Sequence, residues 1–234
     1  MTVVLINPNS TESMTLSALV AARGAAPDVM FEGWTSHDGP PVIQGEADGR
    51  ACVPPLLRLV EKADREGADL IVIACFDDTG LAEARALASC PVIGIGQAAF
   101  TAAALLTDRF AVVTTLPVSV PVIEANLARH GHSAPVLACG VPVAALDADP
   151  DAARPAVLEA AFSAVDGGAE AIVLGCAGMA PLTGPIARGI RRPVLDGVTS
   201  AARLSPALLS GAVRGKRHDP AARSDEHVPA GSVS

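Results

Sequence analysis

Two stretches of this chain share one pattern: a short apolar segment ends at a cysteine and is followed by a turn. The first, Leu70–Gly80, is LIVIACFDDTG, and the second, residues 170–179, is EAIVLGCAGM. Apolar runs of this length, bounded by turn signals, are typical of strands that are buried on both faces. Cys75 and Cys176 therefore end two buried strands, 101 residues apart, and this repetition constrains the fold more than any other feature.

Strands and helices are predicted to alternate along the whole chain. Short apolar segments that end at Asn, Pro, Thr or Gly predict strands, and the longer segments between them predict helices. The expected strands are 3–6, 29–34, 69–74, 91–95, 110–113, 135–138, 169–175 and 193–195, and the expected helices are about 12–24, 51–67, 79–88, 97–107, 118–130, 151–167, 181–189 and 199–210. This alternation predicts an α/β fold with a parallel sheet in each half.

The two predicted halves align element by element. Ile6 corresponds to Val113, at an offset of 107 residues, and Pro91 corresponds to Pro193, at an offset of 102. Offsets this similar favour an internal duplication, although any two strand–helix units look partly alike. We expect the two halves to face each other across a cleft that holds the active site.

The length of the chain, 234 residues and 23.6 kDa, suits two small domains with cores of their own. We expect one α/β domain at residues 1–97 and a second at 98–198. A last helix, at about 199–212, is expected to pack back on the first domain. Residues 213–234 are polar and rich in Gly, Pro and Ser, which predicts a disordered tail.

The composition argues against several classes of partner. The net charge is −8 with scattered Lys and Arg, and aromatic residues make up 3% with no Tyr, which disfavours nucleic acid and anionic membrane. No apolar run reaches the roughly 18 residues of a membrane span. The first residues, MTVVLINPNS, lack signal-peptide features, which predicts a cytoplasmic protein. We expect a small-molecule substrate and a homo-oligomer, to which an exterior apolar helix at 97–107 would contribute.

Cys75 and Cys176 carry the chemistry that the sequence suggests. The five cysteines form no CxxC pair, which predicts free thiols. Ligands of parallel sheets bind at the carboxyl ends of strands, and unpaired N–H groups at a following helix start stabilise a thiolate. If the thiols lie on opposite sides of a substrate, one thiolate removes a proton and the opposite thiol delivers another, which inverts the carbon. No cofactor or metal is required if carbonyl groups flank that carbon.

Free cysteines also occur as small buried hydrophobic residues, and one cysteine alone at a strand end would be interpreted in that way. The matched positions of Cys75 and Cys176 favour a functional pair. Cys139, which ends a strand in the second half, is their main rival. Cys52 opens a helix and Cys90 precedes a strand at its amino end, so both have weaker claims.

A set of motifs spans residues 1–212 in a fixed order. They are Ile6-Asn7-Pro8-Asn9-Ser10, Gly39-Pro40-Pro41-Val42-Ile43, Ala74-Cys75-Phe76-Asp77-Asp78-Thr79-Gly80-Leu81, Thr114-Thr115 and Leu174-Gly175-Cys176-Ala177-Gly178-Met179. With these motifs the chain resembles the aspartate/glutamate/hydantoin racemase superfamily, most closely its hydantoin and allantoin racemase branch.

The resemblance implies two Rossmann-like domains related by a pseudo-twofold. It implies a cofactor-independent racemisation of 5-substituted hydantoins or allantoin, with Cys75 and Cys176 as the acid–base pair. It also implies a set of substrate contacts, in which Ile43 packs against the C5 substituent and Asn7 and Thr114 bind polar atoms of the ring: Asn7, Ile43, Phe76, Asp77, Thr114, Thr115, Ala177 and Gly178. For Asn7, turn chemistry before a proline is an equally good explanation.

The chain departs from the family at two places. Relatives more often show Ser or Gly at the position of Asp77, and here Asp77 and Asp78 together follow Cys75, where their charges would raise the thiol pKa. The usual GPxSIE loop is altered at residues 39–44. Both departures bear on the substrate more than on the type of reaction.

Other interpretations remain beside this one. Residues 94–99, GIGQAA, resemble part of a dinucleotide fingerprint, although helix packing also explains the glycines. His130 and His132 suggest a metal site less well than a solvated turn, and His37 is the histidine best placed for a cysteine hydrolase. A related amino-acid racemase, a maleate-isomerase-like or decarboxylase-like enzyme, and a non-catalytic two-lobed binding protein are the alternatives in function.

Overall fold

The computed structural model describes residues 1–211, and the tail predicted at 213–234 lies outside the described residues. The first half of the chain alternates strands and helices as expected. Its elements are β1 (Thr2–Asn7), α1 (Glu12–Ala25), β2 (Met30–Thr35), α2 (Glu46–Arg65), β3 (Leu70–Ile73), α3 (Leu81–Leu87), β4 (Val92–Gly94) and α4 (Ile95–Ala104).

The second half repeats the alternation. Its elements are β5 (Phe110–Thr114), η1 (Pro117–Ser119), α5 (Val120–Arg129), β6 (Val136–Ala138), α6 (Val143–Ala148), α7 (Pro150–Asp166), β7 (Ala171–Leu174), η2 (Ala177–Leu182), α8 (Thr183–Ile190), β8 (Val194–Asp196) and α9 (Gly197–Gly211), where η marks a 3₁₀ helix.

Each half forms one parallel four-stranded sheet, and the two sheets have the same strand order. The orders are β2-β1-β3-β4 and β6-β5-β7-β8. The registers also correspond, because Ile6 pairs with Ile73 in the first sheet and Val113 pairs with Leu174 in the second. The prediction of an α/β fold with two similar parallel-sheet halves is confirmed.

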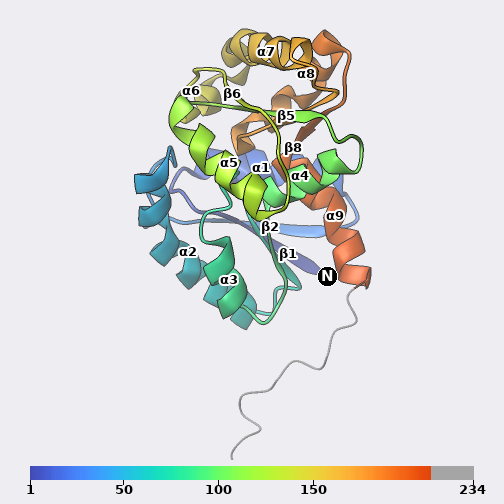
Figure 1. Ribbon diagram of the computed structural model, residues 1–234. Coiled ribbons are helices and arrows are strands. Elements are labelled where there is room, and N and C mark those ends of the chain that lie inside the picture. Colours follow the sequence, from blue (N-terminus) through green and yellow to red (C-terminus); the bar gives the residue numbers. More distant parts are fainter. Residues whose placement is uncertain (212–234) are drawn as a thin grey trace, which may run out of the picture.

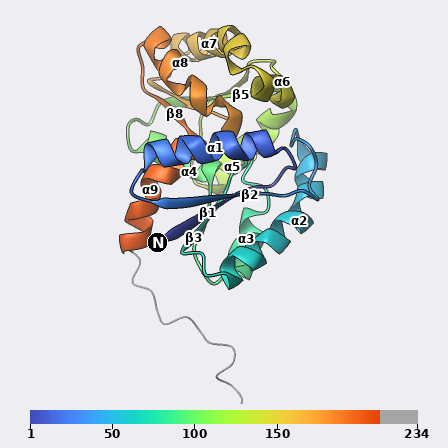
Figure 2. The same cartoon turned by 180° about the vertical axis from the view of Figure 1, so that it is seen from behind.

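Three hydrophobic cores hold the layers together. Alternate residues of a strand face opposite sides of its sheet, so β1 sends Val4 and Ile6 toward α2 and α3, and Val3 and Leu5 toward the middle of the molecule. A matching outer core joins the second sheet to α6, α7 and α8. The inner core lies between the sheets, where α1, α4 and α9 are seen in Figures 1 and 2.

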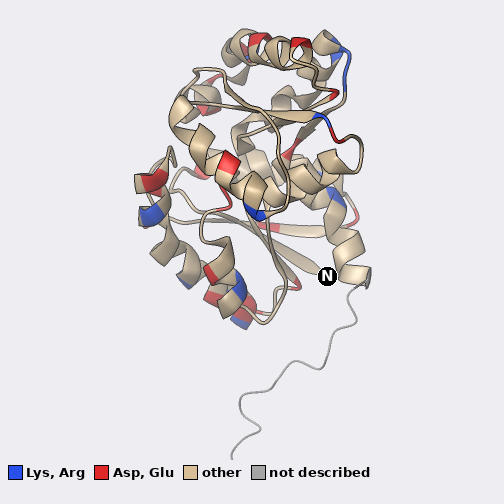
Figure 3. Cartoon of the chain, in the orientation of Figure 1, with Lys and Arg blue, Asp and Glu red and all other residues tan. Residues whose placement is uncertain are grey.

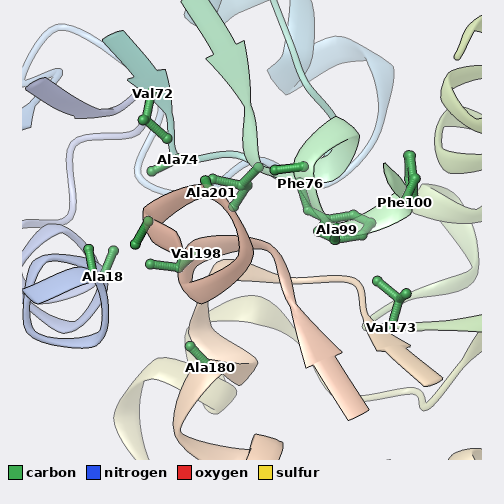
Figure 4. Packing of buried hydrophobic residues seen from close by; sticks show 14 of the residues in the cluster. Ala18, Val72, Ala74, Phe76, Ala99, Phe100, Val173, Ala180, Val198 and Ala201 are labelled. Atoms are coloured by element: carbon green, nitrogen blue, oxygen red, sulfur yellow. The ribbon is translucent and has the colours of Figure 1, made fainter. Parts of the chain in front are cut away.

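The inner core belongs to both halves of the chain. In Figure 4, Val198 and Ala201 of α9 lie among side chains of the first half, such as Val72, and of the second half, such as Val173 and Ala180. Figure 3 shows the charged residues mostly on the outer helices, and α4 carries none. The two halves are therefore joined by buried apolar surface.

The central position of α4 corrects one prediction. The helix expected on the exterior at 97–107 begins at Ile95, and Ala99, Phe100 and Ala103 are fully buried in the inner core. Its apolar character is therefore explained by packing inside one chain and gives no support for an oligomer interface. The expected division at residue 97 falls inside this unbroken helix, and α9 packs against α1 and α4.

Helix boundaries differ from prediction where turns carry unusual backbone angles. The helix expected at 79–88 begins only at Leu81, because Asp78 and Gly80 have φ of +48° and +72°, which a right-handed helix does not allow. The residues between 138 and 151 match no predicted helix or strand, yet the short helix α6 begins there after Pro142 and is held by Leu146, which is fully buried in the outer core.

Asp78 connects the loop after β3 to α4. Its carboxylate accepts hydrogen bonds from the backbone N–H groups of Gly96, at 2.9 Å, and Gln97, at 2.7 Å. A Cβ on Gly94 would lie 2.0 Å from Oδ1 of Asp78, and a Cβ on Gly96 would lie 2.3 Å from the carbonyl oxygen of Phe76. The glycines of GIGQAA thus admit Asp78, which occupies the helix N-terminus that a dinucleotide phosphate would need.

We predict that Gly94→Ala destabilises the fold by about 2 kcal/mol or more, because the new Cβ displaces the Asp78 carboxylate. The φ of Gly94, −99°, suits any residue, so the loss is steric. Denaturant titration of the free energy of unfolding measures it. Gly24→Ala is the control: no atom lies within 4 Å of its Cβ, so we expect unchanged stability or a gain of up to ~1 kcal/mol. Equal stability of the Gly94 variant would contradict this role of Asp78.

Candidate active site

A cavity of about 50 Å³ lies at the carboxyl ends of the central strands of both sheets. Its position agrees with the general rule for ligand sites in parallel α/β sheets. Both Cys75 and Cys176 line it. Its lining residues are Asn7, Asn9, Met14, Ile43, Ala74, Cys75, Phe76, Asp77, Thr115, Ser119, Val143, Asp147, Gly175, Cys176, Ala177 and Gly178.

Cys75 follows β3 directly and is only partly exposed. Its thiol interacts with the backbone N–H of Asp77 and lies 4.0 Å from Oγ1 of Thr79. These contacts favour the thiolate, but burial raises the pKa of the Cys75 thiol well above its usual range, and the negative charge of Asp77 raises it further. Because α3 begins at Leu81, six residues after Cys75, the thiol of Cys75 faces a turn and not the first residues of a helix.

Cys176 has the same surroundings in the second half. It precedes η2, and its thiol interacts with the backbone N–H of Gly178, two residues further on, as Cys75 does with that of Asp77. Burial raises the pKa of Cys176 to about 12, more than this hydrogen bond lowers it. The two thiols thus match in position, in backbone donor and in the direction of their pKa shifts.

The other three cysteines lie outside the cavity lining. Cys52, in α2, is fully buried and donates to the carbonyl oxygen of Gly49 at 3.2 Å. Cys139, the rival in the second half, points its thiol at the carbonyl oxygen of Thr115, at 3.8 Å. Cys90 is packed in the outer core of the first half. The structure therefore brings Cys75 and Cys176 to one cavity and leaves Cys139 beside it.

Asn7 lines the cavity, but its own turn engages its side chain. Nδ2 donates to Oδ1 of Asn9 at 2.8 Å, to the carbonyl oxygen of Thr11 at 3.1 Å and to Oγ1 of Thr15 at 3.0 Å. Oδ1 accepts from the backbone N–H of Asn9 at 3.2 Å. This arrangement agrees with the turn-chemistry explanation of Asn7 and leaves its N–H groups occupied.

Thr114 is the one expected contact residue that does not line the cavity. It is buried in β5, and its hydroxyl donates to the carbonyl oxygen of Gly175 at 3.3 Å. Thr115, the next residue, does line the cavity. A side chain at a strand end faces one side of its sheet, and its neighbour faces the other, so only one of two adjacent threonines is directed at the cavity.

The remaining expected contacts, Ile43, Phe76, Asp77, Ala177 and Gly178, all line the cavity. The ring of Phe76 packs edge to face with Phe100, with centroids 5.3 Å apart, so it also anchors the cavity wall in the inner core. The sequence analysis missed five lining residues, which come from the turn after β1, from α1, from η1 and from α6: Asn9, Met14, Ser119, Val143 and Asp147. Asn9 belongs to the Ile6–Ser10 motif and could have been found there. The lining residues of α6 could not, because no helix is predicted between residues 138 and 151.

Two hydrogen bonds join the halves of the chain next to the cavity. Oγ of Ser13 donates to Asp147 at 2.6 Å, and the backbone N–H of Val143 donates to Oε1 of Gln44 at 3.0 Å. These bonds join α1 and the loop before α2 to α6. The cavity is therefore enclosed by side chains of both halves, as the cleft hypothesis requires.

The two acidic residues after Cys75 have different environments. Asp78 is buried and bonded to α4, and Nε2 of His130 lies 3.6 Å from its Oδ2. Burial raises the pKa of Asp78, and the nearby imidazole of His130 and the hydrogen bonds from α4 partly offset that rise. Asp77 lines the cavity, and burial followed by the charge of Asp78 raises the pKa of Asp77 to about 7. Only Asp77 therefore faces the position of a ligand.

The histidines weighed in the sequence analysis lie elsewhere. His37 is exposed, with Nδ1 3.9 Å from Oε1 of Glu12, and does not line the cavity. His132 packs edge to face with Phe110 at a centroid distance of 6.2 Å. Among residues 1–211, no three His, Cys, Asp or Glu side chains are grouped closely enough to hold a metal ion.

Comparison with known proteins identifies the family. The sequence model described as Asp/Glu/Hydantoin racemase matches residues 3–205. A hydantoin racemase of Rhizobium meliloti is 45% identical over 212 residues, which cover 88% of this chain and 87% of the relative. The chain belongs to the Asp/Glu/hydantoin racemase family.

Solved structures agree with this assignment. An allantoin racemase from Klebsiella pneumoniae has a TM-score of 0.86 and 37% identity, covering 90% of this chain and 88% of that one. A glutamate racemase from Bacillus anthracis has a TM-score of 0.69 at 16% identity, covering 90% of this chain and 82% of that one, and shows the shared two-domain fold alone.

Within residues 1–211, no helix combines the length and apolar character needed to cross a membrane.

We predict that Asp77→Asn shifts alkylation of Cys75 to lower pH, because it removes a negative charge that raises the thiol pKa. Peptide mass spectrometry after short exposure to iodoacetamide, over a range of about pH 7 to 11, measures the labelling rate. Glu83→Gln, which removes an exposed carboxylate outside the cavity lining, is the matched control and should leave the profile unchanged. Identical profiles for Asp77→Asn and the unmodified chain would refute this electrostatic coupling.

Proposed function

We propose that the protein is a cofactor-independent racemase of 5-substituted hydantoins or allantoin, and that Cys75 and Cys176 are its two acid–base residues. The observation that carries the proposal is the matched pair of thiols in one cavity, each two residues before the backbone N–H that it faces. The names of the relatives, hydantoin racemase and allantoin racemase, support the same substrate class.

The reaction needs one thiolate and one thiol at a time. The thiolate removes the proton from C5, and the electron pair moves into the adjacent carbonyl group to form a planar enolate. The opposite thiol then gives its proton to the other face of C5 and becomes the thiolate. A thiolate whose conjugate acid has a raised pKa is a stronger base, so burial of both thiols strengthens proton removal while it lowers the population of the active form.

The charge of the cavity favours a neutral ring over a carboxylate substrate. Among the described residues that line it, none is Lys, Arg or His, whereas Asp77 and Asp147 are acidic. An amino acid, a malonate or maleate would place its carboxylate beside these acids without a cation to pair with it. The alternatives of an amino-acid racemase, a decarboxylase-like and a maleate-isomerase-like enzyme are therefore disfavoured.

Two hydroxyl groups of the second half are available to bind the polar atoms of a substrate ring. Thr115 and Ser119 are buried and line the cavity, and neither hydroxyl hydrogen-bonds to another residue within 1–211. Asn7 and Asn9, on the first half, are already bonded to each other. We assign recognition of the ring carbonyl and N–H groups to Thr115 and Ser119.

We predict that Cys75→Ser and Cys176→Ser each lower racemisation by about 10²-fold or more, because a serine hydroxyl is a far weaker acid than a thiol. Each variant should still exchange the C5 proton of one enantiomer with solvent deuterium, and the two variants should act on opposite enantiomers. Polarimetry measures racemisation of single enantiomers, and NMR measures exchange.

Cys139→Ser is the matched control, because Cys139 lies beside the cavity without lining it, and its activity should stay within about twofold of the unmodified chain. Near-normal racemisation by either the Cys75 or the Cys176 variant would contradict the two-base mechanism. Absence of exchange with every hydantoin tested would instead support a binding protein without catalytic activity.

A further inference from the structure

The carboxylate of Asp77 lacks a partner within the cavity. No backbone or side-chain group among residues 1–211 donates a hydrogen bond to it. The charge that acts on its pKa is that of another carboxylate, Asp78. A buried polar group without a partner costs free energy that a ligand can recover. Asp147, the other acidic residue of the cavity lining, accepts a hydrogen bond from Ser13, so Asp77 is the one with an unsatisfied carboxylate among the described residues.

The backbone of Asp77 is held in place from both sides. Nδ2 of Asn126, in α5 of the second half, donates to its carbonyl oxygen, and its N–H faces the thiol of Cys75. Asn126 is itself buried and accepts a hydrogen bond from Nη1 of Arg129 at 2.6 Å. These contacts hold the backbone of Asp77 in place, so its side chain starts from a fixed position next to the thiol of Cys75.

Asp77 also borders a second hollow. It lines a surface groove of about 340 Å³, together with Gly45, Thr79 and Asn126 among others. The inner cavity, about 50 Å³, holds roughly four water molecules at about 10–15 Å³ each, which suits a small ring but not a ring with a long side chain. Among the described residues, Asp77 is the one that lines both the cavity and this groove, so a C5 substituent directed toward Asp77 would extend toward the groove.

We propose that Asp77 is a specificity-determining residue that accepts a hydrogen bond from the C5 substituent, so that the enzyme prefers hydantoins whose substituent carries N–H donors. A ureido group, an amine and a guanidine are such substituents, and an alkyl group is not. This inference rests on the proposed racemase function and names the substrates within it.

The electrostatics of the cavity agree with this preference. The negative charge of Asp77 raises the pKa of both Cys75 and Cys176. A donor that shares the charge of the carboxylate weakens this effect and favours formation of the catalytic thiolate. A donor-bearing substrate is thus bound better and meets a larger fraction of thiolate.

A matched pair of substrates tests the proposal. The ureido group of allantoin and the isobutyl group of 5-isobutylhydantoin have the same branched shape, but only the ureido group has N–H donors. Leucine approximates the shape of aspartate without its oxygens, so we expect Asp77→Leu to lower the ratio of kcat/KM for allantoin to that for 5-isobutylhydantoin by about tenfold or more. Asp77→Asn, which keeps one acceptor, should give a smaller change in the same direction and covers the case in which the leucine variant does not fold.

Racemisation of single enantiomers is followed by polarimetry, and the uncatalysed rate is subtracted. Glu61→Gln, which removes an exposed carboxylate of α2 that lines neither the cavity nor the surface groove, is the charge-matched control and should leave the ratio unchanged. If both Asp77 variants change the two substrates by the same factor, Asp77 does not select the substituent, and the inference is overturned while the racemase function stands. If the unmodified chain racemises neither compound, the proposed function fails, and the inference falls with it.

Discussion

The hydrogen bonds from the start of α4 to the carboxylate of Asp78 join the two features on which the molecule depends. One is the loop that carries Cys75, and the other is the helix that lies between both sheets. Gly94 and Gly96 permit this contact, because any Cβ there would overlap Asp78 or the carbonyl oxygen of Phe76. The position of the thiol is therefore tied to the inner core and not to its own strand alone.

Burial between the two halves then sets the pKa of the two thiols. The two thiols lie where the halves meet, near the bonds that join α1 and the loop before α2 to α6, and burial there raises the pKa of both cysteines. Within residues 1–211, the carboxylate of Asp77 has no hydrogen-bond donor, and the hydroxyls of Thr115 and Ser119 have no hydrogen-bond partner. A ligand of complementary polarity, a neutral ring with N–H groups, fits such a cavity better than an anion does.

Much of the fold could be predicted from local patterns. The buried strands form unbroken apolar runs, and the offsets between the halves, at Ile6 and Val113 for example, agree with the observed registers. The boundaries of α3 and the existence of α6 could not be predicted, because they depend on the left-handed backbone at Asp78 and on the burial of Leu146 by distant elements. The buried position of α4 was missed because an apolar helix alone does not show what covers it.

The sequence by itself determined that the chain alternates strands with helices, that its halves correspond, and that Cys75 and Cys176 end matching strands. These features follow from residue order within a few positions. Only the tertiary structure decided that Thr115 and not Thr114 lines the cavity, and that Asp77 faces the cavity while Asp78 caps α4. Those outcomes depend on hydrogen bonds and burial between residues far apart in the chain, which no local pattern encodes.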